Sequence, residues 1–370
     1  MAPATYKLVV NMWHGVNLKS WILGFLLSYL SIWSISFLIG DTLVLSAWSP
    51  DTGTWIRPYG SVHKHRSEGW GTSRFGQLDV IGVDDITKTK IPAIAIWGDS
   101  HVEAFQVEQW ERMQDVLMDL WRADGKALTA FGIGNSGESV ADWYFKIPRY
   151  EKRCPEVIAH FIILSGLSDV FPDDPSAEHA TFLSKPEYRI IEHNKEPEHR
   201  RIKVALRKCG LDFVWLPTRS FIKNTKLRFT LGPNKGPRLR NTEDAHKPEP
   251  KKSFSFLLHA LSRQTTKPLI FVYCPHLPTI KDGQVRFEDP DRDIVSMFAE
   301  ECRRNGLGFI DMTEDFHNYY QKTGTFPRGF PNSMPSGGHF NAGGHSLIAK
   351  AIYGATPQYI NGRLDVFHSY

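Results

Sequence analysis

The stretch IAIWGDS at residues 94–100 joins a short apolar run to a Gly-Asp-Ser turn, and a helical pattern continues from it to Trp121. The apolar half has the length and composition of a buried strand. The serine therefore stands where a strand meets the start of a helix, whose backbone N–H groups can point at a developing oxyanion. Gly-Asp-Ser alone also fits an ordinary strand-to-helix turn, so the rest of the chain has to decide.

Four more apolar runs of strand length follow, separated by helical stretches. They are residues 128–133, 158–164, 269–274 and 308–312. A last helix is expected over residues 342–353. Strands that alternate with helices predict right-handed crossovers and a parallel sheet with helices on both faces.

Several candidate site residues follow the predicted strands or lie in the loop before the last helix. They are Ser100, Gly137, Ser168 and His339. Reactive groups of such sheets lie at the carboxyl ends of the strands, so we expect these residues along one edge. A serine hydroxyl needs a positioned base to take its proton.

Residues 21–40 (WILGFLLSYLSIWSISFLIG) contain no charged side chain. As a helix this run spans roughly 30 Å, the hydrocarbon thickness of a bilayer, and we predict a single transmembrane anchor. Lys7 and Lys19 precede it and Asp41 and Asp51 follow it, which predicts a cytoplasmic N-terminus over residues 1–20 and an extracytoplasmic remainder. A cleaved signal peptide is the alternative, but its apolar core usually has about 7–15 residues.

The remaining chain divides into an irregular lead-in over residues 41–90 and an α/β domain over residues 91–370. An insertion at about 172–255 interrupts the domain. Between Lys185 and Lys252, eighteen Lys and Arg residues face eight Asp and Glu residues. We expect this basic segment over one rim of the site, either as a solvated surface or in contact with an acidic polysaccharide or lipid surface.

Composition narrows the function classes. A formal net charge of +4 is too small to indicate nucleic-acid binding. The four cysteines form no CxxC and no Cys/His pair at zinc-ligand spacing, so we expect neither a metal nor a cofactor. Disulfides and free buried thiols are both open for Cys154, Cys209, Cys274 and Cys302.

Short blocks at the strand ends give the chain a family resemblance. Gly-Asp-Ser at 98–100, NSGES at 135–139, GLSD at 166–169 and HFNAGG at 339–344 stand in the order of the four blocks of SGNH (GDSL-like) hydrolases. The resemblance covers residues 93–353 without the insertion. It implies a flavodoxin-like three-layer sandwich with a five-stranded parallel sheet.

The resemblance also implies roles for single residues. Ser100 would be the nucleophile and His339 its base. The oxyanion hole would consist of Ser100, Gly137 and Ser168. Supporting residues would be Asp99, Asp169, Ser336 and Asn341.

Two positions depart from the family pattern. The asparagine of the third block is Ser168, whose hydroxyl still donates but reaches less far. The acid usually found three residues before the histidine is Ser336, and none of the twenty residues before His339 is acidic. We therefore expect a backbone carbonyl or Ser336 to orient His339. Asp311 and Asp315 are candidates only if the fold brings them back.

Two further histidines lie near these blocks. Gly-Asp-Ser-His, with His101, resembles SGNH domains that modify bacterial polysaccharides. An equally open alternative places His101 and Glu103 simply in the first helical turn. His345 is expected to be structural or on the surface.

These features together predict an O-acetyltransferase acting on a secreted polysaccharide. A single transmembrane helix would anchor it in the bacterial inner membrane, with its catalytic domain in the periplasm or otherwise outside the cytoplasm. By resemblance, an integral membrane acyltransferase of the MBOAT type would supply acetyl groups, and Ser100 would carry each one to a sugar hydroxyl. A carbohydrate esterase (deacetylase) is the first alternative, and a non-catalytic SGNH-like scaffold in exopolysaccharide assembly is the second.

Overall fold

The computed structural model describes most of the chain outside the N-terminus and the basic segment. The described residues are 18–39, 44, 46–170, 179–183, 187–192, 250–289 and 291–364, without the side chains of 32–33, 35–39, 168 and 360–364. Of the predicted insertion at 172–255, this leaves residue 179 and its neighbours, the short strands β8 (Thr181–Leu183) and β9 (Arg189–Ile191), and the start of α8. The prediction for the basic segment therefore falls mainly outside the described residues.

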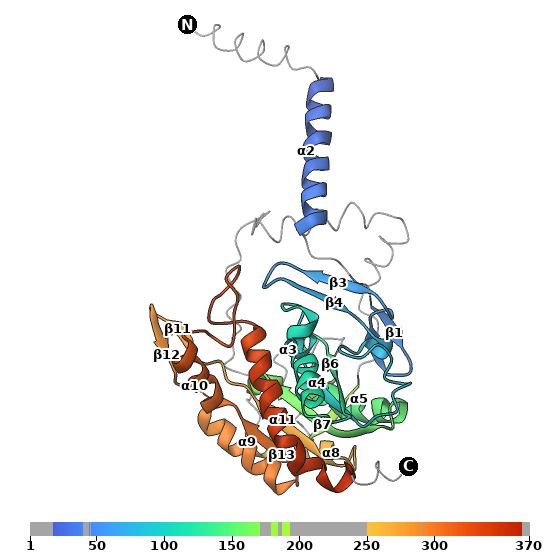
Figure 1. Ribbon diagram of the computed structural model, residues 1–370, viewed down its shortest axis with the longest axis vertical. Helices are drawn as coiled ribbons and strands as arrows, with labels where there is room; N and C mark the ends of the chain where they lie inside the picture. The colour runs from blue at the N-terminus through green and yellow to red at the C-terminus, as the bar shows by residue number, and fades with distance from the viewer. Residues whose placement is uncertain are drawn as a thin grey trace.

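A five-stranded parallel sheet forms the centre of the molecule (Figure 1). Its strands are β5 (Ala93–Gly98), β6 (Thr129–Gly134), β7 (Val157–Leu164), β10 (Leu269–Tyr273) and β13 (Gly308–Asp311). They lie in the order β13-β10-β7-β5-β6, and every neighbouring pair is parallel. This is the flavodoxin-like doubly wound order. The predicted α/β fold with a five-stranded parallel sheet is confirmed.

Helices cover both faces of the sheet. One face carries α5 (Val140–Arg153), α8 (Pro250–Ser262) and α9 (Arg292–Arg304), and the other carries α4 (Met113–Ala123), α10 (Thr313–Thr323) and α11 (Ala342–Leu364). Every residue of β5, β6, β7 and β10 is buried, which explains why these strands read as unbroken apolar runs. On α4, Met113, Leu117 and Trp121 recur every four residues and are fully buried against the sheet.

The chain after the nucleophile turn differs from the expected single helix through Trp121. Helix α3 (Ser100–Glu103) ends where Ala104 adopts a left-handed conformation with φ +51°. The 3₁₀ turn η2 (Gln109–Glu111) and then α4 follow. The helix stops because the next residues pair with another part of the chain: the Trp70 N–H donates to the Gln106 carbonyl at 3.0 Å.

The prediction of an irregular lead-in over residues 41–90 is wrong in part. The segment forms the hairpins β1 (Ala47–Ser49)–β2 (Thr54–Ile56) and β3 (Val62–His65)–β4 (Gly71–Arg74), followed by the 3₁₀ turn η1 (Gln77–Asp79). The strands are too short to show a clear period of two in the sequence. Gly71 packs directly on backbone: an added Cβ would lie 2.3 Å from the Phe105 carbonyl oxygen. A similar small hairpin, β11 (Thr279–Lys281)–β12 (Gln284–Arg286), follows β10.

Helix α2 (Leu18–Ile39) coincides with nearly all of the predicted anchor and projects away from the sheet (Figure 1). Its described apolar side chains are exposed; Trp21 and Phe25 are 67% and 70% accessible. Within the described part of the chain, no helix is long and apolar enough to cross a membrane. The transmembrane anchor at residues 21–40 stays a prediction.

The described cysteines are single buried thiols: Cys154, Cys274 and Cys302. For these three the free-thiol alternative holds. Cys209 lies outside the described residues.

Candidate active site

Ser100 stands at the carboxyl end of β5, on the first turn of α3. The turn needs glycine at position 98, because an added Cβ would lie 2.4 Å from a methyl group of Val102. The Asp99 carboxylate caps α3 by accepting a hydrogen bond from the His101 N–H at 2.9 Å. Asp99, predicted as a supporting residue, therefore fixes the turn that presents Ser100.

Ser100 and His339 meet as the sequence predicted. His339 Nε2 lies 2.9 Å from Ser100 Oγ. On the other side of the ring, His339 Nδ1 lies 2.7 Å from Glu68 Oε2. Glu68 Oε1 also accepts from the backbone N–H of His339 at 3.0 Å. The carboxylate thus holds the proton on Nδ1 and leaves Nε2 free to accept the serine proton, which is the arrangement of a nucleophile–base–acid triad.

The prediction that a backbone carbonyl or Ser336 orients His339 is wrong, because the ring Nδ1 contacts the Glu68 carboxylate. Ser336 Oγ accepts a hydrogen bond from the Ile280 N–H at 3.1 Å instead. Asp311 accepts from the N–H and the hydroxyl of Thr313 at the start of α10. Glu68 was missed because it lies 271 positions from His339, in a segment read as irregular.

Glu68 is placed by the turn that joins β3 to β4. Asn332, from the loop before α11, accepts from the Gly69 N–H at 2.8 Å and donates to the Gly69 carbonyl at 2.9 Å. The next residue, Trp70, pairs with Gln106 beyond α3. The hairpin turn is therefore tied to both segments that it has to bridge, the nucleophile side and the histidine side. The only local signal for it is the Glu-Gly pair at 68–69.

The environment of Glu68 keeps its carboxyl group ionised. Burial alone raises its pKa, but the hydrogen bonds and the charge of His339 outweigh burial and lower the pKa overall. The side chains of Glu68 and His339 are 20% and 23% exposed, so the pair is accessible from solvent without being freely hydrated.

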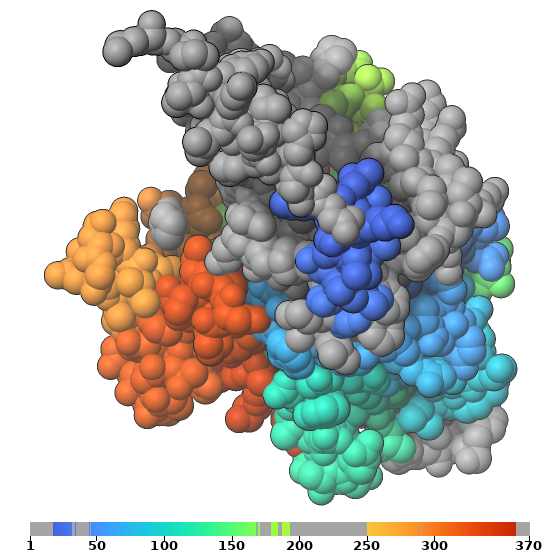
Figure 2. Space-filling model, turned by 90° about the horizontal axis from the view of Figure 1, so that it is seen from above, coloured from blue at the N-terminus to red at the C-terminus, as the bar shows by residue number. Residues whose placement is uncertain are grey.

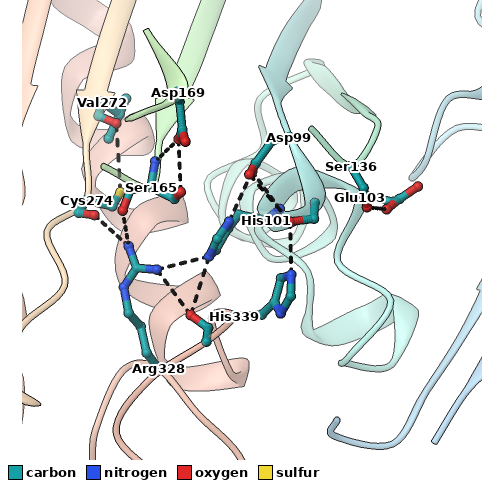
Figure 3. A network of polar contacts seen from close by, with 12 residues as sticks. Asp99, His101, Glu103, Ser136, Ser165, Asp169, Val272, Cys274, Arg328 and His339 are labelled. Atoms are coloured by element: carbon teal, nitrogen blue, oxygen red, sulfur yellow. Dashed lines mark hydrogen bonds and ion pairs between the residues drawn. The ribbon is translucent and has the colours of Figure 1, made fainter. Parts of the chain in front are cut away.

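Gly137 follows β6 and precedes α5, with φ +87°, a backbone conformation that favours glycine. An added Cβ there would lie 3.2 Å from Nε2 of His179. The adjacent Ser136 donates to Glu103 Oε2 on α3 at 2.6 Å, which ties the second block to the nucleophile helix (Figure 3). Among the described residues, no acceptor pairs with the backbone N–H of Ser100 or Gly137. Both groups are therefore free to face an oxyanion.

A buried arginine from the lead-in strengthens the same junction. Arg57 forms ion pairs with Glu103 and with Asp79, the latter at 2.7 Å, and donates to the Gly134 carbonyl at 3.2 Å. Sequence reasoning gave it no role. It shows that the hairpin segment supports the site from outside the sheet.

The third predicted oxyanion donor, Ser168, lies in the 3₁₀ turn η3 (Leu167–Asp169) after β7, and its side chain is outside the described residues. Its donor role stays a prediction. Asp169 accepts from the N–H and hydroxyl of Ser165 at 2.6 and 2.9 Å. Burial is the main cause that raises the pKa of Asp169 to about 7. These two hydrogen bonds fix the chain just beyond the end of β7.

The other supporting residues hold the histidine loop. Asn341 donates to the Phe326 and Gly329 carbonyls at 2.6 and 3.3 Å and accepts from the Gly344 N–H at 3.2 Å, at the start of α11. His345 is buried on that helix, and burial is the main cause that lowers its pKa to about 3. The expectation that His345 is structural agrees with this position.

Comparisons with known proteins add the following. No family model and no curated protein matches the chain. Among solved structures it is similar to the psychrotrophic esterase EstA from Pseudoalteromonas sp. (14% identity, 73% of this chain and 98% of that chain, TM-score 0.36). It is also similar to the acetyl xylan esterase AlAXEase (14% identity, 71% of this chain and 98% of that chain, TM-score 0.38). A third similar structure is TesA (8% identity, 72% of this chain and 99% of that chain, TM-score 0.38). Likenesses this low carry no argument about function, and the chemistry of the site rests on its own geometry.

Proposed function

We propose that the protein is a serine-dependent esterase or acyltransferase that forms an acyl-enzyme on Ser100. The observation that carries the proposal is the continuous chain of contacts from Ser100 through His339 to Glu68. Each member has the partner that its role requires: a nucleophile with a base, and a base with an acid that sets its tautomer.

The proposed reaction has two balanced halves. Ser100 Oγ adds to the carbonyl carbon of an ester while His339 Nε2 takes its proton, and the oxyanion faces the N–H groups of Ser100 and Gly137. The tetrahedral intermediate then expels the alcohol, which receives that proton from His339. In the second half, a water molecule or another hydroxyl gives its proton to His339 and attacks the acyl group. Ser100 leaves with the proton, and the product is an acid or a new ester.

The more specific proposal is O-acetyl transfer to a secreted polysaccharide, with a membrane acyltransferase as donor partner, at the bacterial inner membrane. Two features of the sequence support it. Gly-Asp-Ser-His at 98–101 resembles SGNH domains that modify bacterial polysaccharides, and residues 21–40 form the predicted anchor. A carbohydrate esterase would use the same three side chains, so the acceptor decides between the two. The scaffold alternative had two supports, the acid missing from the histidine block and the serine in the third block, and Glu68 removes the first of them.

The direct test is the intact mass of the 370-residue chain after brief mixing with p-nitrophenyl acetate. We expect an acetyl adduct in the wild type and in Ser296→Ala, a control on the exposed side of α9, and none in Ser100→Ala. His339→Ala should also abolish the adduct. Nitrophenol release equal in the wild type and Ser100→Ala, with no adduct, would refute the acyl-enzyme.

The acceptor is tested on the same adduct. Loss of the acetyl group to an added oligosaccharide, with acetylated sugar as product, supports transfer. Loss to water at a rate that the oligosaccharide does not change supports the esterase.

A further inference from the structure

A second polar network lies directly beside the triad and takes no part in the proton transfers above. It runs from Asp99 through His101 to Arg328 (Figure 3). His101 and Arg328 are 8% and 1% exposed, so the network is shielded from solvent. Arg328 comes from the loop that carries His339, and Asp99 and His101 come from the nucleophile turn. The network therefore connects the two segments that have to meet for catalysis.

Arg328 binds the surrounding chain through backbone carbonyl groups. Its guanidinium donates to the carbonyls of Pro275 at 3.1 Å, Cys274 at 2.6 Å, Ser165 at 3.0 Å and Gly338 at 3.3 Å. These acceptors lie beyond the ends of β7 and β10 and next to His339. Its Nη1 also lies 3.0 Å from His101 Nε2. A guanidinium has N–H donors and no acceptor.

This geometry decides the tautomer of His101. Because Arg328 can only donate, Nε2 of His101 has to be the acceptor and carries no proton. The ring proton is then on Nδ1, which lies 3.0 Å from Asp99 Oδ1 and donates to it. The Gly338 carbonyl oxygen lies 3.4 Å from the same Nε2, farther away than Arg328 Nη1 at 3.0 Å, so we assign the hydrogen bond of Nε2 to Arg328. A protonated His101 would set an N–H against the N–H of the guanidinium.

The state of His101 matters because its ring lies against the catalytic base. The ring centroids of His101 and His339 are 4.8 Å apart, with an interplanar angle of 32°. A positive His101 would oppose the positive charge that His339 gains when it takes the serine proton. When His101 is neutral, the negative charge of the Asp99 carboxylate is not cancelled by the ring beside it. Asp99 Oδ2 lies 3.4 Å from Ser100 Oγ.

Some of the charged and titratable groups around His101 raise its pKa, and others lower it. Burial is the largest influence and lowers its pKa, Asp99 raises it, and Arg328 and His339 lower it, with a net lowering. His276, after β10, and His345, on α11, also interact electrostatically with His101, and the pKa of each is lowered, mainly by burial. Of all these groups, Arg328 alone makes direct contact with Nε2 as a fixed cation.

We propose that Arg328 and His101 are positioning residues for the triad. Arg328 fixes His101 as the neutral Nδ1–H tautomer, and His101 thereby holds Asp99 and the Ser100 turn and leaves His339 as the ring that gains the proton. The catalytic consequence rests on the proposed function, whereas the tautomer itself does not.

The first test reads the tautomer directly. The 370-residue chain with ¹⁵N-labelled histidine is followed by long-range ¹H–¹⁵N spectra, and the His101 signals are assigned by their loss in His101→Asn. We expect a protonated Nδ1 and an unprotonated Nε2 from pH 8 down to below the ordinary histidine pKa of about 6.5. An Nε2–H tautomer, or protonation of His101 near the ordinary histidine pKa of about 6.5, would overturn the proposal.

The second test separates positioning from structure. His101→Asn keeps an N–H donor for Asp99 and cannot gain charge, whereas His101→Leu loses the donor. We expect His101→Leu to lower kcat at least tenfold more than His101→Asn, with similar KM values. Equal effects of the two substitutions would reduce His101 to a packing role and contradict the proposal.

The third test concerns Arg328. In Arg328→Met, His101 is free to titrate, so the acid limb of the kcat/KM profile should move to higher pH, and adding His101→Asn should move it back. Arg328→Lys keeps the charge if the methionine variant fails to fold, and should keep His101 neutral in the spectra. An unmoved acid limb with His101 still neutral in Arg328→Met would overturn the assigned role of Arg328. If no variant shows ester turnover, the spectra still decide the tautomer, and only the proposed function fails.

Discussion

Replacing Glu68 by glutamine tests the residue that completes the triad. Both oxygens of Glu68 accept hydrogen bonds from His339, one from the ring Nδ1–H at 2.7 Å and one from the backbone N–H at 3.0 Å. A glutamine has only one acceptor oxygen, so its NH₂ group must face one of these two donors. The substitution therefore removes the charge and also disturbs the loop that carries the base.

The size of the effect follows from the charge pair. When His339 holds the serine proton, its positive charge lies about 4 Å from the centre of the carboxylate, which is worth about 4 kcal/mol at an effective dielectric constant of about 20. That energy corresponds to about 10³-fold in rate. Solvent screens part of it, because the two side chains are 20% and 23% exposed. We therefore expect kcat/KM to fall by about 10²- to 10³-fold.

The assay is p-nitrophenyl acetate turnover by the 370-residue chain, with thermal unfolding as a check that each variant is folded. Glu300→Gln removes an exposed carboxylate on α9 and should behave as the wild type. Glu68→Asp keeps the charge on a shorter side chain and should recover part of the loss. If folded Glu68→Gln and Glu68→Ala both remain within about threefold of the wild type, Glu68 does not orient the base and the reasoning fails.

Three further outcomes follow from the same geometry. Ser336→Ala should change kcat/KM less than threefold, because its hydroxyl bonds the backbone away from the histidine ring; a loss above tenfold would restore it as the orienting group. Gly69→Ala, with φ +67° and a Cβ 2.2 Å from the Gln106 carbonyl oxygen, should displace the Glu68 turn and lower both Tm and kcat. Gly125→Ala has φ +69° and nothing within 4 Å, so it should lower Tm only slightly; equal effects of the two would rule out the contact as the cause. Because the folded-state pKa of Glu68 lies below 4.5, its ionised form stabilises the fold above about pH 4.5, and that stabilisation is lost as the pH falls through the folded pKa. The unfolding free energy of the wild type minus that of Glu68→Gln should therefore shrink in acid, and a difference that grows would contradict this.

Much of the fold was readable from the sequence, because it depends on local patterns. The strands of a parallel sheet are buried on both faces, so β5, β7 and β10 appear as continuous apolar runs with turn residues at their ends. The nucleophile turn and the glycine-rich stretch before α11 are equally local. They pointed to Ser100 and His339, and in the structure Ser100 Oγ lies 2.9 Å from His339 Nε2.

The hairpins before the sheet were not readable in the same way. Their strands have three or four residues, too few for a period to stand out. Each hairpin packs on a distant part of the chain: β3–β4 on the residues that follow α3, and β1–β2 on Arg149 and Arg153 of α5. The end of α3 at Ala104 has the same origin. A local helical pattern continued there, and a tertiary contact overrode it.

The sequence by itself indicated the α/β class, the strand ends and Ser100 and His339 as candidate site residues, because each lies in a short local pattern of neighbouring residues. The tertiary structure alone decided which carboxylate contacts His339 and which cation contacts His101. Glu68 reaches His339 across 271 positions, and Arg328 reaches His101 across 227. A hydrogen bond between such distant residues produces no periodic pattern in the sequence, because it depends only on where the fold places each of the two side chains.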